Sequence, residues 1–278
     1  YGKGDMTSIE KSFTYVIKVS FLISAMFFLA TLFIPETLMR IFTNEPQLIS
    51  SGIVYLRVVA ASYLFTGISQ IYLCILKNTG YAIKSMVIGS TAVVINIFLN
   101  AALIYGLLFF PEMGIAGAAL ATSISKLVEM GWAYLESLRE KRARLRIKYC
   151  FTREKNLVRD YWKYTMPMLG DYLVWGCGFT TYSVIMGHLG SDAVAANSIA
   201  NIVKNLIVSF CTGLGNGGGI IVGNELGMGN LKQAKEYGGR LCRLAVISGV
   251  LSGVFLVALT PVIVKVTTLS PQATGYLK

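Results

Sequence analysis

The stretch NELGMGNLKQAKEYG (residues 224–238) is similar to the start of the chain, YGKGDMTSIEKSF (residues 1–13). Both segments contain an aromatic or apolar residue, followed by Gly-x-Gly and then by Asp or Asn. In both, a short polar run then leads into a long apolar segment. Aligning Gly2 with Gly227 gives an offset of 225 residues, and the same offset brings Pro46 onto Pro271. Several matches in order indicate an internal repeat.

The sequence around these two segments is strongly apolar. Of its 278 residues, 54% are hydrophobic and only 14% are charged, and the mean hydropathy is +0.61. A soluble domain of this size needs a more charged surface, whereas apolar runs of about twenty residues suit helices that cross a bilayer core of about 30 Å. We therefore predict an all-α, polytopic membrane protein with seven spans, at residues 13–35, 49–76, 82–106, 114–137, 163–187, 193–222 and 239–262.

The repeat sets the expected domain plan. Six spans separate its two copies, and an even number returns the chain to the same side of the membrane, so the repeats are parallel, as in many secondary transporters. We therefore expect part of a twelve-helix transporter with two lobes of six helices. Residues 1–137 then hold the last four helices of the N-lobe, 138–162 a basic cytoplasmic linker, and 163–278 the first three helices of the C-lobe.

The net charge of +11 reflects topology in this interpretation. Eighteen of the 25 Lys and Arg residues lie in loops assigned to one side, three lie on the other side, and four lie within spans. This asymmetry is the positive-inside pattern and marks the first side as cytoplasmic, where basic loops meet anionic lipid. The sequence has no basic globular module with interleaved aromatic residues, so we expect no nucleic-acid partner.

The fifth predicted span carries one carboxylate, Asp171, within PMLGDYLVWGCGFTTY (residues 167–182). A charge at this depth costs free energy unless it is paired or faces water. At helical spacing Asp171, Trp175, Gly178 and Tyr182 share one face. We predict that Asp171 binds the coupling cation or proton, and that Trp175 and Tyr182 line a substrate cavity. An interfacial acid bonded to a neighbouring helix is the structural alternative.

The sixth predicted span adds a polar stripe. Its amides recur every four residues and lie beside a lysine, and lipid contact would leave them without hydrogen-bond partners. The stripe therefore faces protein or a cavity, where Lys204 would neutralise Asp171 or bind a carbonyl group. Hydrogen bonding between helices without a transport role is the alternative. The predicted cavity residues are Asn197, Asn201, Lys204 and Asn205.

Three further features have structural interpretations. Asn96 and Asn100 are four residues apart and predict helix-to-helix hydrogen bonds, and Lys126 and Glu129, three apart, predict an ion pair. The glycines of GLGNGGG (residues 213–219) follow no strand, so they predict close helix packing, tested by Gly217→Leu, rather than a nucleotide site. The cysteines and the single histidine show no metal-ligand spacing, so no metal site is expected.

With these features in place, three stretches resemble the MATE family of multidrug and toxic compound extrusion transporters: MGIAGAALATSISK (residues 113–126), GHLGSDAVAANSIA (187–200) and GNELGMGNLKQAKEYG (223–238). The resemblance implies that the seven spans correspond to helices three to nine of twelve. Many members place an acid eight residues after a proline in helix seven. Here that position after Pro167 is Trp175, and Asp171 follows Pro167 by four residues.

The resemblance implies an antiporter and not an enzyme. It would export organic cations or other amphipathic drugs in exchange for Na⁺ or H⁺, without a cofactor, as a monomer in lipid of the bacterial plasma membrane. A lipid-linked oligosaccharide flippase of the same superfamily is one alternative, and a seven-span receptor or channel is an alternative of another class.

Overall fold

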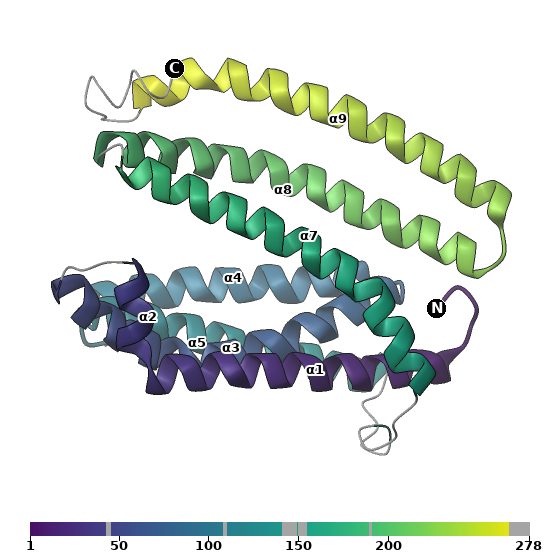
Figure 1. Cartoon of the computed structure of the whole chain (residues 1–278), viewed down its shortest axis with the longest axis horizontal. Coiled ribbons are helices and arrows are strands. Elements are labelled where there is room, and N and C mark those ends of the chain that lie inside the picture. Colours follow the sequence, from purple (N-terminus) through teal and green to yellow (C-terminus); the bar gives the residue numbers. More distant parts are fainter. Residues whose placement is uncertain (43–45, 108–109, 141–148, 150–154, 189–190, 267–278) are drawn as a thin grey trace. The chain divides into compact units, whose positions relative to one another are not determined.

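The computed structural model of the 278-residue chain describes residues 1–42, 46–107, 110–140, 149, 155–188 and 191–266. Over these ranges the chain forms α-helices joined by short turns, and no strand is present (Figure 1). The predicted all-α class is confirmed. The chain divides into two compact units, Lys3–Arg153 and Glu154–Lys278. Most of the predicted linker lies in residues 141–148 and 150–154, outside the described residues.

The first unit contains four long helices and one short helix over its described residues. The predicted spans at 49–76, 82–106 and 114–137 agree with its helices within a few residues at each end. The first helix instead begins well before residue 13, and a short amphipathic helix lies where we expected a loop. The helices are α1 (Met6–Phe33), α2 (Pro35–Phe42), α3 (Pro46–Asn78), α4 (Ala82–Tyr105) and α5 (Gly114–Glu140).

Local chemistry explains where these helices begin and end. Asp5 caps α1 by accepting hydrogen bonds from the Ser8 hydroxyl at 2.6 Å and the Ser8 backbone N–H at 3.0 Å. These bonds lower the pKa of the Asp5 carboxyl below its usual value. Pro35 separates α1 from α2, because proline disfavours helical geometry in the residue before it and suits the first position of a helix. Left-handed Gly80 and Gly106 follow α3 and α4.

The helices of the first unit pack around α3, which contacts α1, α4 and α5. Its core includes Phe13 and Tyr72, whose rings meet edge to face with centroids 5.1 Å apart. At Gly117, α5 approaches α4 so closely that a Cβ atom there would lie 2.5 Å from the carbonyl oxygen of Leu103. Small residues therefore fix the spacing between these helices.

The second unit contains three long helices over its described residues: α7 (Lys155–His188), α8 (Ser191–Gly227) and α9 (Leu231–Val266). Helices α8 and α9 run side by side (Figure 1). Within the glycine-rich segment, Gly218 faces α9, where a Cβ atom would lie 3.1 Å from Leu241 Cδ1. A Cβ atom at Gly217 would meet no atom within 4 Å. Close packing therefore occurs at Gly218, whereas Gly217, the position chosen from the sequence, has no close neighbour among the described residues.

The internal repeat is visible in the backbone. Helix α1 begins at Met6 and α9 at Leu231, which are 225 residues apart. Before each start lies a left-handed glycine, Gly4 with φ of 71° and Gly229 with φ of 83°. Each of these glycines donates its N–H to the carbonyl oxygen three residues earlier, at 2.8 Å and 3.1 Å respectively. The same turn therefore introduces a long apolar helix in both copies, at the offset predicted from the sequence.

Five described helices or helix segments are long and apolar enough to cross a membrane: Met6–Phe33, Pro46–Asn78, Ala82–Tyr105, Ala200–Gly227 and Leu231–Ala258. The two other predicted spans, α5 and α7, carry more polar and charged residues. Their 27 and 34 residues correspond to about 40 and 51 Å of helix, enough to cross a bilayer core. The two least apolar long helices are thus the ones that carry Glu129 and Asp171.

Candidate functional site

One candidate site lies between α7 and α8 in the second unit. The rings of Trp175 and Phe179 stack with centroids 5.7 Å apart, and the Lys204 ammonium lies 5.7 Å from the centre of the Phe179 ring. Closer to the end of α7, the Tyr182 hydroxyl donates a hydrogen bond to Asn197 Oδ1 at 3.1 Å. The structure therefore brings the predicted Trp175, Tyr182, Asn197 and Lys204 onto facing sides of one helix pair.

Phe179 is a member of this site that the sequence analysis missed. We expected Gly178 on the stripe, but Phe179 is the residue four positions after Trp175, and it joins Trp175 to Lys204. Its aromatic type at i+4 spacing was the signal that could have identified it. The ring face attracts the lysine charge through its quadrupole, so Lys204 is held by an aromatic ring rather than by an acid.

Asp171 is exposed, as are nearly all residues of α7 around it. Among the described residues it has no ion pair or hydrogen bond, and Lys204 lies over Phe179, eight residues further along α7. The hypothesis that Lys204 neutralises Asp171 is therefore not supported by the geometry within this unit. Of the other predicted cavity residues, Asn201 is half-buried and Asn205 is exposed on α8.

An open pocket of about 480 Å³ lies along α7. The residues that line it all belong to one helix and include one tyrosine, one leucine, two threonines and two small residues. The sequence analysis missed this second face of α7, although its positions recur every four residues as on the Asp171 face. The lining residues are Tyr172, Leu173, Gly176, Cys177, Thr180 and Thr181.

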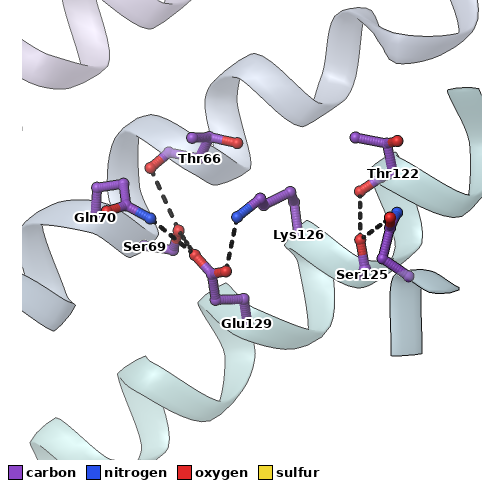
Figure 2. Close-up of polar contacts among 8 residues, drawn as sticks. Thr66, Ser69, Gln70, Thr122, Ser125, Lys126 and Glu129 are labelled. Carbon is purple, nitrogen blue, oxygen red and sulfur yellow. Dashed lines mark hydrogen bonds and ion pairs between the residues drawn. The ribbon is translucent and has the colours of Figure 1, made fainter. Parts of the chain in front are cut away.

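A second polar cluster lies inside the first unit, between α3 and α5 (Figure 2). The predicted ion pair is present, with Lys126 Nζ 2.7 Å from Glu129 Oε2. From α3, the Ser69 hydroxyl donates to Glu129 Oε1 at 2.6 Å, and the Gln70 amide donates to the same oxygen at 3.2 Å. We call these four residues the Glu129 cluster. The sequence predicted its lysine and glutamate but not its α3 partners.

The predicted asparagine pair lies on α4, next to α5. Asn100 Nδ2 donates to Asn96 Oδ1 at 3.0 Å, and Asn96 Nδ2 donates to Ser125 Oγ on α5 at 3.3 Å. The predicted helix-to-helix role is confirmed for Asn96, whereas the hydrogen bond of Asn100 stays within α4. Asn100 Oδ1 is buried and accepts no hydrogen bond from the described residues.

An ion pair with different surroundings lies at the other end of α4. Lys84 Nζ is 2.6 Å from Glu136 Oε1 on α5, with the lysine side chain 41% exposed and the glutamate 11% exposed. In the Glu129 cluster the corresponding exposed fractions are 28% and 2%. The two pairs therefore have similar lengths but are buried to different degrees within the unit. No group of three or more His, Cys, Asp or Glu side chains suited to a metal occurs in the described part of the chain.

Comparison with known proteins gives matches in both units. A profile of the MatE family matches residues 1–102 and 167–277. The chain is 26% identical over 246 residues to the probable multidrug resistance protein NorM of Thermotoga maritima, covering 85% of this chain and 51% of that protein. It is also 26% identical over 211 residues to the uncharacterized transporter YisQ of Bacillus subtilis, covering 75% of this chain and 45% of that protein. The chain thus spans about half the length of the curated relatives it matches.

Solved structures give the same fold. A MOP superfamily transporter from Pyrococcus furiosus matches with a TM-score of 0.84 at 19% identity, over 99% of this chain and 61% of that one. A multidrug resistance MATE family transporter of the MOP superfamily, in an outward-facing conformation, matches with a TM-score of 0.84 at 18% identity, over the same shares. At these identities the likeness establishes the fold alone.

Proposed function

The chain belongs to the MATE family of multi-pass membrane transporters, and we propose that the protein is a secondary antiporter that exports organic cations or other amphipathic drugs. The observation that carries this proposal is the match of the MatE profile to both units, together with the multidrug resistance relatives. Its proposed location is the bacterial plasma membrane, and its proposed state is a monomer surrounded by lipid. Proteins of this family are transporters and not enzymes.

In the proposed mechanism Asp171 couples export to an inward flow of Na⁺ or H⁺, without a cofactor. A carboxylate in a membrane helix is costly while it is charged and unpaired, so it favours a state with a bound proton, metal cation or cationic drug. Ion and drug then compete for one negative charge, which is the requirement for exchange. The absence of an ion pair to Asp171 among the described residues is consistent with an acid that remains available for such ligands.

The aromatic side chains of α7 would hold the drug. Trp175 and Tyr182 are 70% and 45% exposed, so their rings are accessible in this unit. Stacking and cation–π contacts with such rings contribute about 0.5–2 kcal/mol each for a cationic ligand. Lys204 and the α8 amides Asn197, Asn201 and Asn205 would supply polar contacts on the facing helix. A flat organic cation with polar substituents fits this combination.

The test measures efflux of a fluorescent organic cation such as ethidium from cells, with Na⁺ and pH gradients imposed separately. We expect Asp171→Asn to insert normally but to lose ion-driven efflux, and Asp171→Glu to keep part of it. Asp160→Asn is the matched control, because Asp160 is another exposed acid of α7, near the start of the helix. Efflux by Asp171→Asn at the wild-type rate, with unchanged ion dependence, would remove Asp171 from the mechanism.

A further inference from the structure

The Glu129 cluster places a negative charge inside the first unit, far from both ends of α5. The Glu129 side chain is 2% exposed, and Ser69 beside it is fully buried. A buried carboxylate costs free energy unless a positive charge and hydrogen-bond donors compensate it. All of these donors come from α3 and α5, so the cluster is complete within one helix pair.

The two charged members of the cluster differ in their freedom to leave it. Glu129 is enclosed, whereas the Lys126 side chain is 28% exposed and has a long flexible stem. The lysine side chain therefore reaches the outer face of the unit, whereas the glutamate side chain is enclosed. Once Lys126 has moved away, Glu129 has no other ion pair to the described residues and must take up either another cation or a proton.

The remaining groups around Glu129 can supply oxygen ligands. The Ser69 hydroxyl has two lone pairs, and turning the Gln70 amide about its last bond presents its oxygen in place of its nitrogen. The Ser69 hydroxyl also lies 3.3 Å from the carbonyl oxygen of Thr66 (Figure 2). Carboxylate, hydroxyl, amide and carbonyl oxygens suit hard metal cations. A monovalent cation keeps the cluster neutral, whereas a divalent cation would leave an uncompensated positive charge.

We propose that Glu129, Ser69 and Gln70 form a binding site for a monovalent metal cation of the Na⁺ type, which the Lys126 ammonium occupies until the metal displaces it. The lysine acts as an internal competitor that keeps the site neutral when it holds no metal. This proposal rests on the geometry of the first unit, so it is independent of Asp171 and of drug efflux.

The first experiment measures binding of radioactive ²²Na⁺ to the purified protein in detergent, at constant ionic strength set with choline chloride. Removing the competitor in Lys126→Met should raise the affinity for Na⁺ at least tenfold, equivalent to about 1.4 kcal/mol. The increase should be absent in the double variant Lys126→Met/Glu129→Gln, which lacks the carboxylate. Equal Na⁺ affinity in Lys126→Met and the wild type would overturn the proposal.

Lys84→Met is the matched control, because it removes the lysine of an ion pair of nearly the same length without the buried oxygen ligands. It should leave Na⁺ affinity unchanged, and a gain equal to that of Lys126→Met would show that any unpaired glutamate attracts the ion. Thermal stability distinguishes the metal from a proton. If acid but not Na⁺ stabilises Lys126→Met, the carboxyl takes up a proton and the metal site is refuted.

The second experiment uses the wild-type protein, so it does not depend on the folding of a variant. When Na⁺ displaces Lys126, a membrane-permeant amine-reactive ester should label this residue at least twofold faster than in choline, as measured by mass spectrometry. In Glu129→Gln the labelling rate should be high and independent of Na⁺. Wild-type labelling of Lys126 that is the same in Na⁺ and in choline would refute displacement.

Discussion

A double-mutant cycle on Lys126 and Glu129, in choline chloride without Na⁺, tests how strongly the buried pair is coupled. Lys126→Met leaves a carboxylate that is 2% exposed without its cation, which should cost about 3–5 kcal/mol of unfolding free energy. Glu129→Gln should cost less, about 1–2 kcal/mol, because Ser69 and Gln70 retain a hydrogen-bonding partner and the lysine can turn outward. The double variant restores neutrality, so the coupling energy should reach about 3 kcal/mol.

The pair Lys84–Glu136 provides the internal standard for this cycle. Its N–O distance of 2.6 Å is close to the 2.7 Å of the buried pair, but its lysine is 41% exposed. Solvent screening should reduce its coupling energy to about 1 kcal/mol or less. The assay is reversible unfolding in detergent, read by tryptophan fluorescence. A coupling energy for Lys126 and Glu129 no larger than that of Lys84 and Glu136 would refute the reasoning from burial. Added Na⁺ should lower the coupling energy of Lys126 and Glu129.

Three further outcomes follow from local geometry. Gly117→Ala should lower the unfolding free energy by about 1–3 kcal/mol, because the added methyl group meets a backbone carbonyl. Gly131→Ala on the same helix should raise the unfolding free energy by about 0.5–1 kcal/mol, because the added methyl group meets no described atom and alanine favours helix. Thermal unfolding of the two variants measures both effects. Gly218→Leu should reduce the monodisperse yield in size-exclusion chromatography, and an equal loss in Gly217→Leu would contradict the packing of α8 on α9. Hydrogen bonding lowers the folded-state pKa of Asp5, so its stabilising effect is present above the unfolded pKa and is lost as the pH falls through the folded value. The protection of the first α1 amides, relative to their intrinsic exchange rates, should therefore fall below about pH 4 in the wild type but not in Asp5→Asn.

Most helices could be predicted from the sequence because membrane helices require continuous apolar runs, and these runs are visible without any tertiary information. The first turns of α1 and the whole of α2 were missed for the same reason. The polar segment that begins at Met6 and the amphipathic segment Pro35–Phe42 are helical without being apolar throughout. Their helicity follows from capping by Asp5 and from proline at a helix start, which a search for apolar runs does not detect.

Contacts between residues of the same helix could be predicted from the sequence, whereas contacts between different helices could not. The pairing of Lys126 with Glu129 follows from i,i+3 spacing, and it is present. Ser69 and Gln70 lie about sixty residues away in the chain, and only the register of α3 against α5 brings them to Glu129. The roles predicted for Asp171 and its neighbours in transport stay predictions, because the geometry locates these side chains without a ligand.

The surroundings of the two acids differ. Each acid is in a long helix that is less apolar than its neighbours. A charged carboxylate inside a membrane costs free energy, so each acid requires a compensating charge or hydrogen bonds. Glu129 has its compensation within the unit, from one cation and two hydrogen-bond donors. Asp171 has none among the described residues. Glu129 is therefore a site at which a cation must first displace a bound lysine. The exchange role proposed for Asp171 depends instead on the efflux assay of Asp171→Asn.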